Sequence, residues 1–250
     1  MKMTENTILI TGATSGIGLG LAEALHARGN KVIIAGRRQD KLDSITARNP
    51  RMTGMLLDVD ARDALSSFAA QVREAFPNLN VLINNAGISR PETLTEGMDN
   101  LAVAEAIVQT NILGVLRMTA ELLPCLTRQP RSAIITTTSG LAFVPRAPFP
   151  TYCASKAFLH SWLQSLRVQL RDTSVEVLEL APPYVQTALA GPDQETDPRA
   201  MPLADYVAEV MERLEAENTP SGEILVERVR QLRTAEASGQ YDKIFAMLNG

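Results

Sequence analysis

Short apolar runs rich in β-branched residues alternate along the chain with longer amphipathic segments. The apolar runs predict β-strands at residues 7–10, 31–35, 52–57, 81–84, 132–138, 175–181 and 223–226. The segments between them predict helices at residues 16–28, 40–48, 61–76, 99–123, 152–171 and 205–217. This alternation is typical of an α/β protein in which helices cover both faces of a parallel sheet.

Right-handed connections between such strands give a doubly wound parallel sheet, the Rossmann fold, which binds ligands at the carboxyl ends of its strands. Residues 140–150 and 182–202 lack regular periodicity and follow strands, so we expect both stretches to overhang the ligand end. Within the second stretch, we expect residues 188–203 to form a lid over a substrate.

The chain has 250 residues, a length that fits one large α/β domain or two small ones. We predict a single domain over residues 1–250, because no linker rich in Pro, Gly or Ser divides the sequence. A hydrophobic fraction of 45% supports a sizeable core, and 21% charged residues is ordinary for a soluble protein.

The mild net charge of −4 gives no reason to expect a nucleic acid or an anionic membrane as partner. Residues 1–10 are too short and polar for a secretory signal, and we find no apolar run near the roughly 20 residues that span a bilayer. Cys125 and Cys153 are too few for a disulfide scaffold, so we expect a cytoplasmic protein. With His26 and His160 they show no zinc-ligand spacing, and we expect no metal.

A glycine-rich turn, Thr11–Gly18, follows the first predicted strand and opens the first predicted helix. Gly12 permits a tight turn at positive φ, while Gly16 and Gly18 let backbone approach a pyrophosphate at the helix N-terminus. The other interpretation is a plain strand-to-helix turn. The turn lacks Gly-Lys-Ser/Thr, which argues against a nucleotide triphosphatase loop.

Tyr152 and Lys156 are four positions apart in a predicted helix, so the phenol and the ammonium group lie on one face. A free tyrosine keeps its proton to about pH 10, and a neighbouring positive charge lowers that pKa. A tyrosine tuned in this way can give a proton to an oxygen, or take one back, near neutral pH.

Together with other motifs in the same order, this pair resembles the short-chain dehydrogenase/reductase family from residue 7 to about residue 187. The motifs are Thr11-Gly-x-x-x-Gly-x-Gly18, Asp58, Asn84-Asn-Ala-Gly87, Asn111, Ser139, Tyr152-x-x-x-Lys156 and Pro182-x-x-Val185-x-Thr187. Residues 139–145, 181–183 and 241–245 also resemble a bacterial branch of that family, the DltE-like proteins.

The resemblance implies that Asn111, Ser139, Tyr152 and Lys156 form a catalytic tetrad. Tyr152 would be the acid/base, Lys156 would lower its pKa and bind the nicotinamide ribose, and Ser139 would polarise the substrate carbonyl. Asn111 would hold a water that links Lys156 to solvent. The cofactor-binding residues implied are Gly12, Thr14, Ser15, Gly16, Ile17, Gly18, Arg37, Arg38, Asp58, Val59, Asn85, Ala86, Gly87, Tyr152, Lys156, Pro182, Val185 and Thr187.

Cofactor choice falls at the end of the second predicted strand, where an acidic residue favours NAD and an arginine accepts the 2′-phosphate of NADP. Gly36 stands where NAD-preferring relatives place Asp, and Arg37 and Arg38 follow it, so we predict NADP(H). The alternative is a pair of solvated arginines. The family commonly has Pro-Gly where this chain has Pro182 and Pro183, which affects the path toward Thr187.

We expect substrate contacts from Ser139, Leu141, Phe143, Tyr152 and Tyr184, a largely apolar set that suits a small hydrophobic ketone or aldehyde. Arg146 could bind a carboxylate or phosphate of the substrate, or be a solvated loop residue. In the family, the helices equivalent to residues 99–123 and 152–170 pair between subunits, which implies a homodimer or homotetramer.

These expectations describe an NADP(H)-dependent oxidoreductase that interconverts a carbonyl and an alcohol by hydride transfer, with Tyr152 as general acid/base. The alternative is a non-catalytic, NADP(H)-binding regulatory protein on the same fold. A sugar-nucleotide epimerase or dehydratase also uses Tyr-x-x-x-Lys, but such enzymes usually have a longer chain and a Gly-x-x-Gly-x-x-Gly turn.

Overall fold

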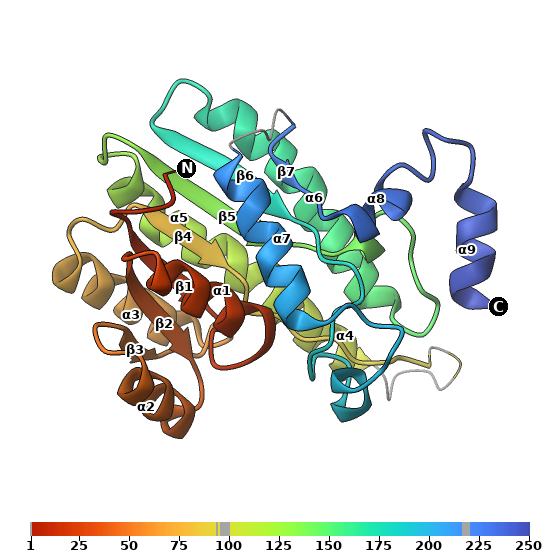
Figure 1. Ribbon diagram of the computed structural model, residues 1–250, viewed down its shortest axis with the longest axis horizontal. Helices are drawn as coiled ribbons and strands as arrows, with labels where there is room; N and C mark the ends of the chain where they lie inside the picture. Colours follow the sequence, from red (N-terminus) through yellow and green to blue (C-terminus); the bar gives the residue numbers. More distant parts are fainter. Residues whose placement is uncertain (1, 94, 96–100, 217–220) are drawn as a thin grey trace.

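A parallel sheet with the strand order β3-β2-β1-β4-β5-β6-β7 forms the centre of the computed structural model (Figure 1), which describes residues 2–93, 95, 101–216 and 221–250. The strands are β1 (Thr7–Thr11), β2 (Lys31–Gly36), β3 (Thr53–Leu56), β4 (Val81–Asn84), β5 (Ser132–Thr137), β6 (Val175–Leu180) and β7 (Glu223–Ile224). The order reverses between β1 and β4, and every pair is parallel. The doubly wound sheet predicted from the sequence is confirmed.

Helices cover both faces of this sheet because successive side chains of each strand point to opposite faces. On β1, Ile8 and Ile10 pack in the core under α1 (Gly16–Ala27), α2 (Gln39–Arg48) and α7 (Leu203–Glu215). Leu9, between them, packs in the core under α3 (Arg62–Ala75), α5 (Val115–Leu126) and α6 (Pro150–Leu170). The bounds predicted for α1, α2, α3, α6 and α7 shift by one or two residues, and residue 217 lies outside the described residues.

The helix predicted at residues 99–123 consists, where the structure describes it, of α4 (Leu101–Ile107), a π-helical stretch (Val108–Gly114) and α5. Residues 99 and 100 lie outside the described part of the chain. By length and composition alone, Leu101–Leu126 could cross a membrane. However, α5 packs on the sheet and buries Met118, Leu122 and Leu126 in the core, as a helix of a folded domain does.

Two further helices follow β7, α8 (Glu227–Arg233) and α9 (Tyr241–Asn249), and neither is predicted from the sequence. Figure 1 shows α9 beside the body of the molecule, at the end away from α2. It packs through Ile244 on Val144 and Ala235, and the Asn249 side-chain amide donates to the Pro145 carbonyl at 3.1 Å. The C-terminal helices therefore support the loop that follows β5.

Candidate active site

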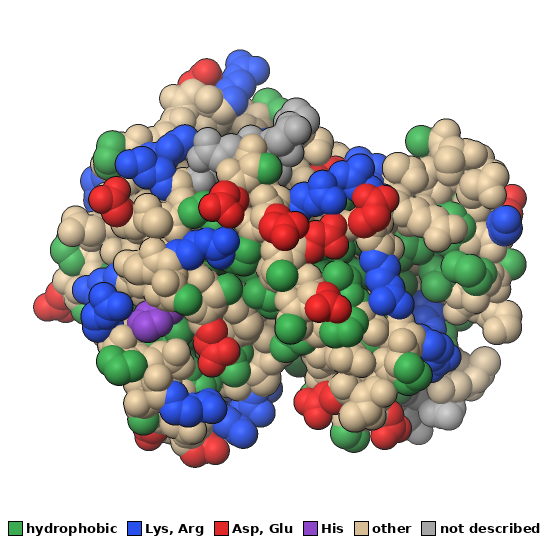
Figure 2. All heavy atoms as spheres, in the orientation of Figure 1, with side chains coloured by type: hydrophobic (Ala, Val, Ile, Leu, Met, Phe, Trp, Pro, Cys, Tyr) green, Lys and Arg blue, Asp and Glu red, His purple; other side chains and the backbone are tan. Residues whose placement is uncertain are grey.

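A cavity of about 530 Å³ lies beyond the carboxyl ends of β1, β2, β4 and β5, where the fold places its ligands. Figure 2 shows the surface notched at its lower edge in the view of Figure 1. Most residues predicted to bind cofactor or substrate line this cavity. They are Gly12, Thr14, Ser15, Gly16, Ile17, Arg37, Arg38, Asp58, Val59, Asn85, Ala86, Gly87, Ser139, Tyr152, Lys156, Pro182, Val185 and Thr187.

The glycine-rich turn requires glycine because its backbone has positive φ angles and passes close to neighbouring backbone atoms. Gly12 has φ +66° and Gly16 has φ +55°, both in the left-handed region that favours glycine. A Cβ on Gly12 would stand 2.7 Å from Ala86 Cα, and one on Gly18 would stand 2.7 Å from the Gly12 carbonyl oxygen. Gly18 is not a lining residue, so its role is to let α1 approach the turn.

Thr11 and Asn85 join the carboxyl ends of β1 and β4. The Thr11 hydroxyl accepts hydrogen bonds from the backbone N–H groups of Asn85 and Ala86, each at 3.1 Å. The Asn85 amide in turn donates to the Thr11 and Gly12 carbonyls at 3.1 and 3.2 Å. The two loops that would enclose a dinucleotide are thereby fixed to each other at the switch point of the sheet.

At the end of β2, the two predicted arginines make different contacts. Arg37 is largely exposed, and its Nη1 lies 4.0 Å from the Asp60 carboxylate. Arg38 reaches back to the glycine-rich turn, where its Nη2 donates to the Thr14 and Ser15 hydroxyls at 2.8 and 3.0 Å. Both guanidinium groups line the cavity, and Arg38 also braces the turn.

Ser139, Tyr152 and Lys156 meet at the other end of the cavity. Ser139 follows β5, and its hydroxyl accepts a hydrogen bond from the Leu141 N–H at 3.1 Å. Tyr152 and Lys156 are in the first two turns of α6, as their spacing predicts, and Lys156 Nζ lies 5.7 Å from the centre of the Tyr152 ring. Lys156 Nζ donates to the Thr137 carbonyl at 2.8 Å, so β5 and α6 hold the three groups together.

Burial controls the acidity of this pair. It raises the pKa of Tyr152 to about 12, although the Ser139 hydroxyl opposes the rise, and it lowers the pKa of Lys156 to about 8. The sequence predicts a lowered pKa for Tyr152, and that expectation is wrong for the structure because desolvation outweighs the hydrogen bond with Ser139. At neutral pH the phenol is therefore protonated and ready to donate.

Asn111 is fully buried in the π-helical stretch and is not a lining residue. Its side-chain carbonyl accepts from the Ile88 N–H at 2.9 Å, and its amide donates to the Ile88 carbonyl at 3.0 Å and to the Ser155 hydroxyl at 3.1 Å. These bonds tie the segment after Gly87 to α6. In the structure, then, the Asn111 side chain joins the segment after Gly87 to the helix that contains Tyr152 and Lys156.

Pro183 does not turn the chain away from the cavity. Val185 pairs with Met201 in an isolated bridge, and Thr187 lies beside Gly16, with its Cγ2 3.3 Å from where a Cβ on that glycine would be. Gln194 is buried and donates to the Val185 carbonyl at 2.7 Å and to the Thr187 hydroxyl at 3.3 Å. Part of the predicted lid, residues 192–195, is a 3₁₀ helix that supports Thr187.

Comparison with known proteins agrees with this geometry. The family model described as short chain dehydrogenase matches residues 6–198. The chain is 40% identical over 252 residues, covering 100% of this chain and 98% of the relative, to an uncharacterized oxidoreductase DltE of Bacillus subtilis. It is 33% identical over 189 residues, 73% of this chain and 74% of the relative, to sulfoacetaldehyde reductase 2 of Chromohalobacter salexigens.

The chain belongs to the short-chain dehydrogenase family. A crystal structure of a short-chain dehydrogenase from Burkholderia cenocepacia in complex with NADP superposes with a TM-score of 0.84 at 25% identity, covering 99% of each chain. The match extends over the C-terminal helices as well as the sheet.

Three residues expected to contact substrate do not line the cavity of this short-chain dehydrogenase. Leu141 packs in a small cluster with Tyr152 and Cys153. Tyr184 is exposed, and its hydroxyl donates to the Asp197 carboxylate at 3.1 Å. Phe143 packs edge-to-face on His160 and lies under the Arg233 guanidinium, 5.1 Å from its ring centre.

Other lining residues were not among the predicted site residues, Asp60, Ile88, Ser89, Arg90, Thr110, Thr137 and Thr138 among them. Ala188, Leu189 and Gln194, which also line the cavity, belong to the predicted lid at residues 188–203. Ile88, Ser89 and Arg90 directly follow the Asn-Ala-Gly motif, so their position in sequence was an available signal. The contact of Thr137 with Lys156 could not be predicted from the sequence, because Thr137 makes it through a backbone carbonyl, which every residue has.

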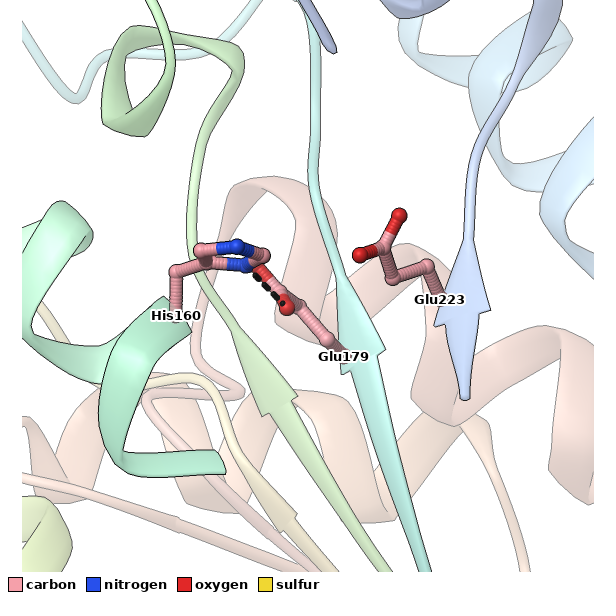
Figure 3. Close-up of side chains that lie close together, drawn as sticks. All are labelled: His160, Glu179 and Glu223. Carbon is pink, nitrogen blue, oxygen red and sulfur yellow. Dashed lines mark hydrogen bonds and ion pairs between the residues drawn. The ribbon is translucent and has the colours of Figure 1, made fainter. Parts of the chain in front are cut away.

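His160, Glu179 and Glu223 meet behind the active site, from α6, β6 and β7 (Figure 3), with possible ligand atoms within 4.8 Å of one another. These side chains already make hydrogen bonds and ion pairs within the protein. The buried Glu179 accepts from His160 Nδ1 at 2.8 Å and from the Thr138 hydroxyl at 2.7 Å, and Arg233 binds Glu223 through two nitrogens at 2.8 and 2.9 Å. We interpret the cluster as an ion-pair network that anchors the strand end before Ser139.

Proposed function

We propose that this short-chain dehydrogenase is an NADP(H)-dependent oxidoreductase that interconverts a ketone or aldehyde and the corresponding alcohol. The observation that supports the proposal most directly is the convergence of Ser139, Tyr152 and Lys156 on one cavity that also contains the glycine-rich turn. A relative named for sulfoacetaldehyde reduction acts on an aldehyde, which is consistent with a carbonyl substrate.

The residues of the cavity fit a nicotinamide dinucleotide. The Ser15 side chain makes no capping hydrogen bond to α1, so the N–H groups of the first turn are available to phosphates, and Gly16 keeps that approach free of a side chain. Arg37 and Arg38 offer guanidinium groups to a 2′-phosphate. The Burkholderia cenocepacia relative was crystallised with NADP, which supports the same choice here.

When bound, the reduced nicotinamide supplies a hydride to the carbonyl carbon. The Tyr152 phenol, protonated at neutral pH, donates its proton to the carbonyl oxygen and becomes a phenolate. The Ser139 hydroxyl is on the same wall and donates a hydrogen bond that stabilises the developing negative charge. Lys156, held by the Thr137 carbonyl, stabilises the phenolate until the proton returns from solvent, and in oxidation the same groups act in reverse.

The test is a panel of ketones, aldehydes and secondary alcohols with NADPH or NADP⁺, followed by absorbance of the reduced nicotinamide. We expect turnover of at least one pair, and Tyr152→Phe should lose at least about 100-fold in kcat because the proton donor is gone. Calorimetry should show that this variant still binds NADPH, because the glycine-rich turn and the two arginines are intact. Full activity of Tyr152→Phe would contradict the mechanism, whereas tight NADPH binding without turnover of any compound would favour the regulatory alternative.

A further inference from the structure

The segment after Gly87 carries an arginine into the catalytic end of the cavity. Ile88, Ser89 and Arg90 are all lining residues. Ile88 packs against the cluster that contains Tyr152, and its backbone is held on both sides by the Asn111 side chain.

Glu92 fixes the other end of this segment. Its carboxylate accepts from the Thr151 N–H at 3.0 Å and the Thr151 hydroxyl at 2.7 Å, and its own N–H donates to the Pro148 carbonyl at 3.0 Å. Arg90 therefore lies between two points that are each fixed beside Tyr152, one through Ile88 and one through the residue that precedes the tyrosine. The backbone of Arg90 thus lies in a loop that is fixed at both ends beside the active site.

Negative and positive side chains lie at different ends of the cavity wall. Among the described lining residues, the carboxylates are Asp58 and Asp60, which follow β3 and lie at the end where Arg37 is found. At the Tyr152 end the ionisable cations on the wall are Lys156 and Arg90, with no lining carboxylate from the described residues.

Arg90 also makes no hydrogen bond or ion pair with any residue that the structure describes, and it is exposed to the cavity. Glu92, two positions on, is not a lining residue, and its carboxylate is engaged by Thr151. A guanidinium group is a planar fork that binds carboxylate and other oxyanions through two parallel hydrogen bonds. Arg90 therefore has unpaired hydrogen-bond donors on the wall of the cavity with which it can bind an anion.

We infer that Arg90 binds an anionic group of the substrate, so that the enzyme acts on a small carbonyl compound or alcohol that also carries a carboxylate or sulfonate. The inference rests on the proposed carbonyl–alcohol reaction. It replaces the hydrophobic substrate expected from the sequence, because Leu141, Phe143 and Tyr184 do not line the cavity and Arg90 does. Arg146, the arginine noted in the sequence, is not a lining residue and lies 5.7 Å over the Phe149 ring.

The turnover experiment compares aldehydes of similar size that differ in charge, 4-oxobutanoate with pentanal and sulfoacetaldehyde with butanal, using NADPH. The wild-type enzyme should prefer at least one anionic aldehyde over its neutral match at least tenfold in kcat/KM. Arg90→Met, which keeps length without charge, should raise KM for that aldehyde at least tenfold and leave the neutral aldehydes within about twofold. Arg90→Lys should retain part of the preference, and Arg146→Met, the matched control, should retain all of it.

A binding experiment separates this inference from the proposed function. Calorimetric titration of 4-hydroxybutanoate and of 2-hydroxyethanesulfonate into the NADP⁺-loaded Tyr152→Phe enzyme measures anion binding without turnover. Adding Arg90→Met should weaken binding of at least one of these anions at least tenfold.

The outcomes are distinct. If the wild-type enzyme turns over anionic and neutral aldehydes equally well, the role of Arg90 is overturned and the carbonyl–alcohol reaction stands. The same holds if the preference for the anionic aldehyde is lost in Arg146→Met and kept in Arg90→Met. Binding that depends on Arg90 with no turnover of any aldehyde overturns the proposed reaction and supports the anion site. Absence of both turnover and Arg90-dependent binding overturns both.

Discussion

Lys156, for which we propose a catalytic role, lowers the stability of the folded protein at neutral pH. Its side chain is only 4% exposed, and burial lowers its pKa from 10.5 to about 8. Below pH 8 the folded and unfolded states both carry the proton, so the whole cost of the buried charge is present. Between pH 8 and 10.5 the folded state releases the proton while the unfolded state keeps it, so the cost is relieved as pH rises.

We therefore predict that Lys156→Met is more stable than the wild type at neutral pH although it is inactive. The buried charge costs about 3 kcal/mol at 1.4 kcal/mol per pH unit, and loss of the bond to the Thr137 carbonyl takes back about 1–2 kcal/mol. The free energy of unfolding in urea should rise by about 1–2 kcal/mol at pH 7, and the gain should vanish by pH 10. A variant less stable than the wild type at pH 7 would refute this account.

Arg37 is the residue at which cofactor preference can be tested most cleanly. Arg37→Asp should raise KM for NADPH far more than KM for NADH, because a carboxylate repels the 2′-phosphate and accepts a hydrogen bond from a 2′-hydroxyl. Arg48→Asp, the same charge change on exposed α2, is the control. An unchanged ratio of the two KM values in Arg37→Asp means that the assignment to Arg37 is mistaken.

Gly36 is a poorer place for the same change. A Cβ at this position would lie 2.7 Å from the Thr14 methyl group, and Thr14 also accepts the hydrogen bond from Arg38. An aspartate there would disturb the glycine-rich turn as well as the charge. The sequence identified Arg37 and Arg38 as candidates for binding the 2′-phosphate. It did not predict that they make different contacts, because the hydrogen bond from Arg38 to Thr14 depends on how β1 and β2 pair.

At the scale of elements, α6 depends on a residue far from it in sequence. No side chain caps the helix at Phe149, but the Glu92 carboxylate binds the N–H and hydroxyl of Thr151 in its first turn, directly before Tyr152. A carboxylate at a helix N-terminus satisfies free N–H groups and interacts favourably with the helix dipole. Glu92 thus fixes the start of the helix that carries the proposed acid.

Glu92→Ala should lower the free energy of unfolding by about 1–2 kcal/mol and reduce kcat, with NADPH affinity kept. Thermal unfolding, steady-state kinetics and calorimetric titration measure the three effects. Glu74→Ala, an exposed glutamate on α3, serves as the matched control. If kcat is unchanged while stability falls, Glu92 supports the fold without positioning Tyr152.

The hydrophobic pattern predicted the central strands well because β1, β2, β4, β5 and β6 are largely buried and read as apolar runs. It predicted one helix at residues 99–123, because a 3.6-residue period does not distinguish α-helix from a short π-helical stretch. The short helix α8 escaped prediction since its seven residues, ERVRQLR, bury only Val229 and otherwise look like a polar loop. Contacts such as Glu92 with Thr151 join residues 59 positions apart, which local patterns do not report.

For the whole molecule, the two helices that pair between subunits in the family carry exposed apolar residues. Leu101 is 43% and Val108 38% exposed on the first, and Phe158 is 42% and Val168 62% exposed on α6. Large apolar side chains in water on such helices favour a covering partner. A second copy of this chain is the partner that the family resemblance implies.

We predict a homodimer or homotetramer in sedimentation velocity, and a shift toward monomer when Phe158 and Val168 are both changed to Lys, since buried ammonium groups oppose association. Leu56→Lys, at an exposed position on the edge strand β3, is the control and should not change the mass. A wild-type protein that sediments as a monomer at micromolar concentration contradicts the prediction.

The fold and most of the cavity wall were predictable from the sequence. Parallel strands all end at one edge of the sheet, and most of the sequence motifs come directly after a strand, so the motifs meet at that edge. The substrate end was not, because it depends on how the C-terminal helices hold the loop after β5. Phe143, for example, is drawn toward His160 and Arg233 by contacts with α6 and α8.

The π-helical stretch Val108–Gly114 has a consequence for how this protein can evolve. A regular α-helix turns by about 100° per residue, so deleting one position there would rotate everything downstream by roughly that angle. Either Asn111 would leave Ile88 or Met118 and Leu122 would leave the sheet. A change in the length of that stretch would therefore break one of these two sets of contacts, whereas a substitution would leave the register of both intact.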